Sequence, residues 1–286
     1  MAVIMVFSFA ACGKKDAPEP LDGPGMVNEE NTTIRLATTT SVNDSGLLGY
    51  LLPVFEKASG YKVEVASAGT GVAIGYAKSG DADLLLVHSK SQEEQFIADG
   101  FASTERLSFM YNYFVVAGPA DDPAKIAQKE SAADCFTAIS QAKAPFASRG
   151  DNSGTHNKET GIWEAAAIDP AKESWYNSVG SGMGDTLTKA NELKAYVLTD
   201  KATFLSMKDS LSELKILKAE AEDMKNTYSL IGVNPAAKDF EGKDVKINTE
   251  GAQALIDWLL GEEAAKLIEE YGKEEYGEQL FFLLNK

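Results

Sequence analysis

Residues 81–89 read DADLLLVHS, and this stretch decides the fold. Four consecutive apolar residues lie between Asp83 and His88, which is typical of a parallel strand buried on both faces. The flanking segments 70–78 and 91–100 have helical patterns, and the second of them ends at a glycine. A buried strand between two helices predicts a parallel α/β sheet, in which ligands bind beyond the carboxyl ends of the strands.

The same alternation of strands and helices continues in both directions along the chain. Strands are predicted at 33–40, 61–69, 81–89, 109–119, 145–151, 195–200, 214–221 and 227–235. Helices are predicted at 47–60, 70–78, 91–100, 153–168, within 174–192, and at 249–272 with a break near Gly261. We expect two α/β lobes joined by two or three crossing strands, with the ligand in the cleft between the lobes. Lobe 1 is assigned to 33–116 and 229–286, and lobe 2 to 117–228.

The charge and the rare residues exclude several classes of function. The 286 residues include 27 Lys and Arg against 43 Asp and Glu, for a formal net charge of −16. Such a surface repels nucleic acid, so no nucleic-acid partner is expected, and local dipoles must hold any anionic ligand. Two histidines and two distant cysteines, Cys12 and Cys135, are too few for a His- or Cys-rich metal site.

The first residues predict export. Residues 1–12, MAVIMVFSFAAC, form an apolar run that is too short to span a bilayer but fits the core of a secretory signal, although the usual basic start is missing. FAAC before Gly13 resembles the lipobox of bacterial lipoproteins, in which the cysteine, here Cys12, is lipidated. The alternative is a fragment of buried strand or helix. Residues 13–32 carry Pro, Gly and charge without periodicity and predict a flexible tether.

Residues 148–156, SRGDNSGTH, combine features that suit an anion. A strand leads into a helix here, and a helix N-terminus presents unpaired N–H groups and a partial positive charge. Ser153 is a good N-cap, Thr155 adds a hydroxyl, Gly154 permits close approach, and Arg149 offers a planar fork of donors. In the alternative interpretation, Ser153 only caps the helix and Arg149 only pairs with Asp151.

Three further turns combine hydroxyls with glycines before a helix. They are TTTS followed by Ser45 and Gly46 (38–46), SAGTGVA (67–73) and SGMGDT (181–186). The first two lie at the same sheet edge as VHS (87–89), so we expect these turns to converge in space. Capping alone does not readily explain four such turns in one chain.

A specific resemblance joins these motifs. In order, ATTTS, GTG, GDADLLLVH, MYNYFVV, APFASRGDNSGTH, GMGDTL, AYVLTD and YGEQLFF resemble the tungstate-binding proteins of bacterial ABC importers, which have the two-lobed type II periplasmic-binding-protein fold. The resemblance covers the chain from Thr33 onward. It implies a membrane permease and an ATPase as partners, an exported monomeric protein, and no cofactor. The ligand contacts it implies are Thr39, Thr40, Ser41, Thr70, Arg149, Ser153, Gly154 and Thr155, with Ser67, His88, Asp151, Gly182 and Met183 as further candidates.

The choice of anion depends on protonation. Hydrogen phosphate needs an acceptor, usually a carboxylate, whereas sulfate, molybdate and tungstate carry no proton near neutral pH. Phosphate-binding relatives place an aspartate after the strand equivalent to DADLLLV, where this chain has His88, which argues against phosphate. Asp151 remains an alternative acceptor unless Arg149 neutralises it, and His88 can instead be a satisfied, partly buried side chain. Only the family resemblance favours tungstate over molybdate.

Two rival functions use the same nine residues. A hydrolase would use Ser153 and His156, but the G-x-S-x-G elbow is absent and no acid has an evident place beside His156. Cell adhesion through Arg149, Gly150 and Asp151 would need an exposed loop tip, whereas this tripeptide leads from a strand into a helix.

Overall fold

Two strands, β4 and β9, connect all the strands into one hydrogen-bonded network in the computed structural model, which describes residues 31–284. The order along the network is β2-β1-β3-β9-β4-β7-β5-β6, and β8 and β10 also pair with β4. The strands are β1 Thr33–Thr39, β2 Lys62–Ala68, β3 Leu84–Val87, β4 Leu107–Pro119, β5 Phe146–Ser148, β6 Tyr176–Ser178, β7 Tyr196–Asp200, β8 Leu214–Lys218, β9 Lys225–Gly232 and β10 Phe282–Leu283.

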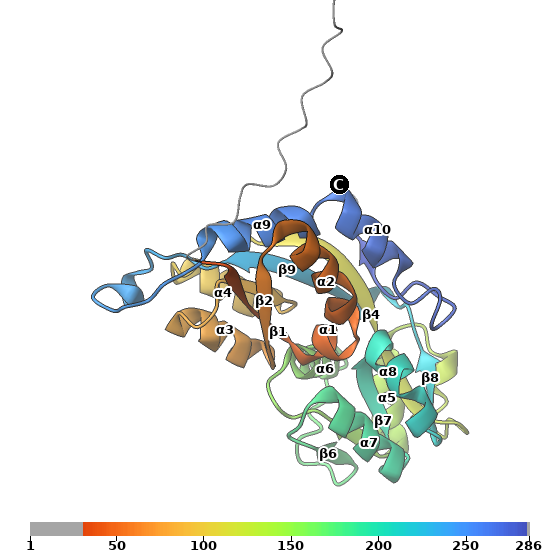
Figure 1. Cartoon of the computed structure of the whole chain (residues 1–286). Helices are drawn as coiled ribbons and strands as arrows, with labels where there is room; N and C mark the ends of the chain where they lie inside the picture. Colours follow the sequence, from red (N-terminus) through yellow and green to blue (C-terminus); the bar gives the residue numbers. More distant parts are fainter. Residues whose placement is uncertain (1–30, 285–286) are drawn as a thin grey trace, which may run out of the picture.

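Helices cover the two parts of this network (Figure 1). They are α1 Thr40–Asp44, α2 Leu47–Ser59, α3 Thr70–Ser79, α4 Lys90–Ala98, α5 Ala132–Ala142, α6 Gly154–Ala165, α7 Met183–Leu193, α8 Lys201–Met207, α9 Thr249–Leu259 and α10 Glu262–Glu270. In Figure 1 the first part of the chain and the blue C-terminal part form one lobe, and the green and cyan middle forms the other.

The long strand β4 belongs to both lobes. Its residues Leu107–Tyr113 pair antiparallel with β9, and its residues Phe114–Ala117 pair antiparallel with β7. On either side of this crossing the strands are parallel, because β1 pairs with β2 and β3, and β5 pairs with β6 and β7. The predicted two-lobed α/β architecture is therefore confirmed, and antiparallel crossing strands connect the two parallel regions.

Each lobe has apolar side chains packed on both faces of its sheet. In lobe 1 one buried cluster includes Leu36, Phe55 and Leu255, and a second includes Leu85 and Phe96. In lobe 2 the clusters are built around aromatic residues such as Phe136 and Trp163, and around Met183 and Leu187. The continuous burial of Leu84–Val87 agrees with a strand that is covered on both faces.

Helix α8 links the two lobes. Ala202 packs in the core of lobe 1, whereas Phe204, two residues later, packs in the core of lobe 2. The ammonium group of Lys201 forms ion pairs with Glu220, at 3.4 Å, and with Glu278 near the C-terminus. This helix was not predicted from the sequence, because seven residues with one buried turn carry little periodic signal.

Other short elements, and helix α5, also escaped sequence prediction. The turn at 40–46 contains the five-residue helix α1, and α2 begins at Leu47, where the helix at 47–60 was predicted to begin. Gly46 lies between them with a φ of 83°, where glycine is favoured. Strand β6 has only three residues. Helix α5 begins after an N-cap serine, a residue type that the sequence shows. The side chain of Ser131 accepts a hydrogen bond from the N–H of Asp134.

Asp83 fastens three segments of lobe 1 together. Its buried carboxylate accepts hydrogen bonds from the backbone N–H of Arg35 at 2.7 Å and from that of Asn248 at 2.9 Å. The Arg35 guanidinium also donates to it, at 2.5 and 3.1 Å. This single carboxylate therefore ties strand β1, the start of β3 and the N-terminus of α9.

We predict that Asp83→Asn destabilises the protein by about 2–4 kcal/mol, because an amide donor replaces one carboxylate oxygen and the Arg35 charge loses its counterion. Urea unfolding at pH 7 measures this loss. The exposed Asp121 provides the control, since Asp121→Asn removes the same charge without a buried partner. Equal stability of the two variants would show that Asp83 does not fasten the lobe.

Candidate functional site

Arg149 is a buried positive charge at the boundary between the lobes. Its side chain is 3% exposed, and one terminal nitrogen donates to Asp151 Oδ2 at 2.6 Å. The second carboxylate oxygen of Asp151 accepts from the backbone N–H of Ser153 at 3.1 Å. The Nε of Arg149 is buried and has no hydrogen-bond partner within residues 31–284. The arginine therefore keeps a donor available after its pairing with Asp151.

The N-terminus of α6 follows directly. Ser153 is the N-cap, and its hydroxyl accepts from the backbone N–H of His156 at 3.2 Å. Gly154 and Thr155 form the first turn and are buried, and the Thr155 hydroxyl has no partner in the described part of the chain. A turn of helix with free backbone N–H groups lies beside the Arg149 charge, which is the arrangement that binds oxyanions.

Lobe 1 contributes hydroxyl groups and one imidazole. The hydroxyls of Thr39 and Ser41 lie 3.2 Å apart, and Ser41 Oγ lies 3.1 Å from His88 Nε2. Thr40 begins α1 and Thr70 begins α3, and both hydroxyls are buried without a partner among the described residues. The turns at 38–41 and 87–89 thus meet at the carboxyl ends of β1 and β3, as we expected from the sheet.

The two lobes touch at these turns. A methyl group placed on Gly69 would lie 3.6 Å from the Cα of Ser153, and one placed on Gly154 would lie 2.3 Å from Cε1 of His88. Glycine is required at position 154, because any side chain would collide with the imidazole. The turn before α3 therefore contacts the turn before α6, although Gly69 and Ser153 are 84 positions apart in the sequence.

Unsatisfied buried polar atoms concentrate here. A buried donor without a partner costs about 1–3 kcal/mol, so such atoms are uncommon in a folded protein. Several of those found in residues 31–284 belong to the candidate site and to its neighbours. They are Thr40 Oγ1, Thr70 Oγ1, His88 Nδ1, Arg149 Nε and Thr155 Oγ1.

The remaining candidates are placed differently. Ser67 is exposed on β2, and no hydrogen bond connects it with the other candidates. Gly182 is the N-cap of α7, which lies beside α1. Met183 is completely buried in a hydrophobic cluster of lobe 2, and its contact with a ligand stays a prediction.

Burial keeps His88 neutral. Desolvation and the nearby charge of Arg149 lower its pKa to about 4. Burial tends to raise the pKa of Asp151, but hydrogen bonds from Ser153 and the Arg149 charge outweigh it and lower that pKa. The site therefore holds a neutral imidazole and an ionised, already paired carboxylate near neutral pH.

Sequence analysis missed Asp200. This carboxyl group is fully buried, caps α8 by accepting from the backbone N–H of Thr203 at 2.8 Å, and has one oxygen without a partner in the described segment. Burial raises its pKa to about 6, against the effects of hydrogen bonds from Thr203 and the Arg149 charge. Asp200 stands at the carboxyl end of β7, so the rule used for the other turns would have found it.

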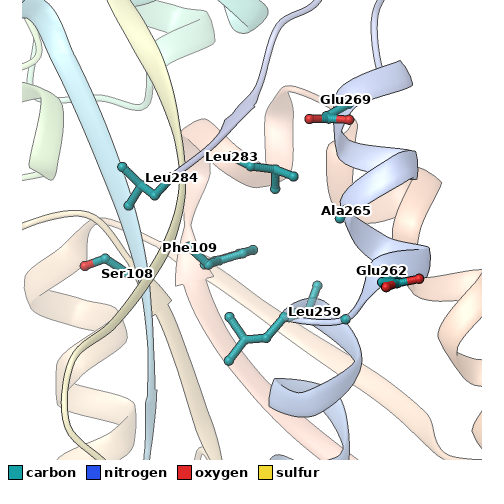
Figure 2. A pocket seen from close by; sticks show the side chains of 10 residues that line it. Ser108, Phe109, Leu259, Glu262, Ala265, Glu269, Leu283 and Leu284 are labelled. Atoms are coloured by element: carbon teal, nitrogen blue, oxygen red, sulfur yellow. The ribbon is translucent and has the colours of Figure 1, made fainter. Parts of the chain in front are cut away.

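A separate cavity lies on the outer side of lobe 1 (Figure 2). Its volume is about 430 Å³, and its walls include Phe109, Leu259 and Leu283. Glu262 and Glu269 also line it and would repel an anion, so it does not suit an oxyanion. Nowhere in residues 31–284 do three or more His, Cys, Asp or Glu side chains gather to hold a metal ion.

The fold and the cleft define a two-lobed solute-binding protein. Residues 27–263 match the model of the PBP superfamily domain, so the chain belongs to the periplasmic-binding-protein superfamily. Two solved structures are similar to it over nearly their whole length. The tungstate ABC transporter structure from Geobacter sulfurreducens has a TM-score of 0.74 at 43% identity and covers 84% of this chain and 98% of its own. The tungstate-binding protein TupA from Desulfovibrio alaskensis G20 has a TM-score of 0.75 at 35% identity and covers 89% and 99%.

A relative of known function identifies the family within this superfamily. The tungstate-binding protein TupA of Peptoclostridium acidaminophilum is 44% identical over 281 residues, which is 98% of this chain and 94% of the relative. The chain belongs to the family of these tungstate-binding proteins, as the resemblance of its motifs predicted. This family consists of solute-binding components of ABC transporters, which is not a class of enzymes.

The other predictions have mixed outcomes. Arg149 is buried and paired, so the Arg-Gly-Asp tripeptide is not presented as an adhesion signal. Cys135 is a free, buried thiol. Cys12, the predicted signal segment 1–12 and most of the predicted tether lie outside the described residues. Helices of the described part are all too short or too polar to cross a membrane.

Glu159 lies in the middle of α6 and is buried in lobe 2. It is 2% exposed, and one oxygen accepts from Trp163 Nε1 at 3.1 Å and from the Tyr176 hydroxyl at 2.7 Å. Burial raises its pKa to about 7 from the ordinary value of 4.5, although the hydrogen bonds oppose that shift. The folded protein therefore binds a proton that the unfolded chain releases between these two values.

We predict that Glu159→Gln removes a pH dependence of stability. The stability that the protonated carboxyl group contributes is present below pH 4.5 and is lost as the pH rises through 7, up to about 3 kcal/mol. The variant stays neutral and should gain stability relative to the parent protein at pH 8 but not at pH 5. Urea unfolding at both pH values tests this, with the exposed Glu164→Gln on the same helix as the control. A pH-independent difference would contradict the raised pKa.

Proposed function

We propose that this protein captures a tetrahedral oxyanion, tungstate, in the cleft between its lobes and delivers it to the permease and ATPase of an ABC importer. The observation that carries the proposal is the convergence of buried, unpartnered donors on a buried arginine. Thr40, Thr70, Arg149 and Thr155 come from both lobes and each has such an atom. A tetrahedral anion accepts hydrogen bonds from many directions, and bonds to a charged acceptor are worth about 1.5–3 kcal/mol each.

The charges around the cleft favour an unprotonated anion. A neutral His88 takes the place where phosphate-binding relatives have an aspartate, and Asp151 is already paired with Arg149. Phosphate is still an alternative ligand, because one buried oxygen of Asp200 has no partner among the described residues. This oxygen can accept a hydrogen bond from the protonated oxygen of hydrogen phosphate. Molybdate and sulfate match tungstate in charge and shape. The tungstate-binding relatives support tungstate over these two.

The arrangement of Ser153 and His156 supports ligand binding and does not suit a hydrolase. The Ser153 hydroxyl accepts the backbone N–H of His156, and His156 Nδ1 accepts the backbone N–H of Asn152 at 2.9 Å. A nucleophilic serine needs a histidine base whose second nitrogen is oriented by an acid. Here a backbone amide takes that position.

Closure of the lobes would bury the anion. We assign 33–116 and 229–286 to lobe 1 and 117–228 to lobe 2, so the contacts of Gly69 with Ser153 and of His88 with Gly154 join different lobes. An ABC permease would recognise this closed form. The predicted lipid anchor at Cys12 would keep the protein at the extracytoplasmic face of the membrane.

Thermal melting with tungstate, molybdate, sulfate and phosphate side by side tests the proposal. A ligand at about 100 times its Kd adds about 2.7 kcal/mol of stability. We expect the largest increase in melting temperature with tungstate or molybdate and little with phosphate. The absence of any increase with all four anions would refute oxyanion binding.

We predict that Arg149→Ala weakens tungstate binding by at least about tenfold, because it removes a charge-assisted donor from the cleft. The tungstate affinity of Arg149→Lys should lie between those of the parent and of Arg149→Ala, since lysine retains the charge but lacks the fork of donors. Isothermal titration calorimetry measures the affinities, and melting without ligand confirms that each variant is folded. Unchanged affinity in a folded Arg149→Ala variant would remove Arg149 from the site.

A further inference from the structure

A positively charged cavity borders the candidate site. Its volume is about 600 Å³, and both His88 and Gly154 line it, so it lies immediately beside the contact between the lobes. Its wall carries one acidic residue, Glu94, and four residues with a positive charge. These are Lys90, Arg106, Lys158 and Lys225. In a chain whose formal net charge is −16, this is a local reversal of sign.

Two of the four charges are already compensated. Arg106 donates from Nε to Glu93, whose side chain is fully buried. Lys90 lies 3.6 Å from Glu94, and both of these side chains are largely exposed. These two pairs contribute little net charge to the cavity.

Lys158 and Lys225 are the cations that remain. Neither forms an ion pair with a carboxylate in the described part of the chain. The ammonium of Lys225 lies 4.0 Å from the ring centre of Tyr111, a contact that stabilises the cation without a negative charge. Lys158 is partly buried, and desolvation lowers its pKa against the attraction of Asp223. An ammonium group in this environment is stabilised by an anion.

The position of Lys158 connects the cavity with the inner site. Lys158 follows Gly154 by four residues on α6, so the two lie on the same face of the helix, one turn apart. Gly154 belongs to the turn that carries the proposed anion contacts, and it touches His88. An anion held by Lys158 is therefore about one helical turn from the cleft.

We propose that this cavity is an outer, weak binding site for the same tetrahedral oxyanion, held by Lys158 and Lys225 before it enters the cleft past His88 and Gly154. The inference rests on the proposed function. Lysine suits such a role because its ammonium is a hydrated point charge on a flexible stem, without the fixed geometry of the Arg149 fork. A site of this kind raises the rate of association, since charged walls concentrate ligand and can accelerate encounter by 10-fold or more.

The test compares association rates of tungstate with two variants of equal net charge. The first is Lys158→Gln with Lys225→Gln, which removes the two lysines of the cavity that form no ion pair. The matched control is Lys238→Gln with Lys243→Gln, two exposed lysines of lobe 1 that do not line the cavity. Stopped-flow fluorescence of the tryptophans, of which Trp163 lies on α6, follows binding at about 20 mM and about 200 mM ionic strength.

We expect the first variant to bind tungstate at least about fivefold more slowly than the parent at low ionic strength, with a dissociation rate within about twofold. Its association rate should also depend less on salt. The control variant should keep the association rate of the parent. If binding leaves the fluorescence unchanged, calorimetry at the two ionic strengths replaces it. The Kd of the Lys158 and Lys225 variant should then depend less on salt than that of the parent.

The outcomes separate this inference from the proposed function. An unchanged rate in a folded Lys158 and Lys225 variant overturns the outer site, and so does an equal slowing in the control, which would reflect net charge alone. Neither result affects the role of Arg149. Failure of the parent protein to bind tungstate would refute the proposed function itself. If the double variant does not fold, Lys225→Gln alone gives the same comparison, and an unchanged rate then also counts against the outer site.

Discussion

The burial of the Arg149 charge is the constraint on which the cleft depends. A guanidinium group is protonated at any physiological pH, and removing it from water is tolerated only beside negative charge or good acceptors. Asp151 satisfies one side of the group, while Nε remains without a partner in residues 31–284. The charge also acts on neighbouring groups. It adds to burial in lowering the pKa of His88, and at Asp200 it opposes the burial that raises the pKa of that carboxyl group. The cleft is thus arranged around one permanent cation.

The fold places that cation where both lobes can reach it. The carboxyl ends of β1 and β3 face the cleft from one lobe, and those of β5 and β7 face it from the other. Short turns follow each end, and they bring hydroxyls and helix N-termini together without long loops. Because β4 runs through both lobes, the two sets of strand ends are held at a common boundary. Rigid sheets therefore determine the positions of donors that lie far apart in the sequence.

Much of this arrangement could be predicted from the sequence, and the exceptions have physical reasons. The apolar run at Leu84–Val87 and the regular alternation around it are local signals, so the two-lobed α/β class followed from them. The contact between Ser41 and His88 joins residues 47 positions apart and depends on sheet register, which the sequence does not show. Sequence reasoning predicted the convergence of the turns but not which atoms would lack partners. Asp200 was not predicted because the segment around it, AYVLTDKATF, has none of the glycines that marked the other turns.

The chain enters lobe 2 along β4 and returns along β9, and these two strands are antiparallel neighbours. Lobe 2 is therefore a continuous stretch of sequence between two parts of lobe 1, with its entry and exit close together. Such a stretch can be exchanged in evolution as a cassette. It carries Arg149 and the first turn of α6, so an exchange would replace the charged half of the cleft at once. The hydroxyl groups of lobe 1, and the outer surface of that lobe, would pass unchanged to the descendant protein.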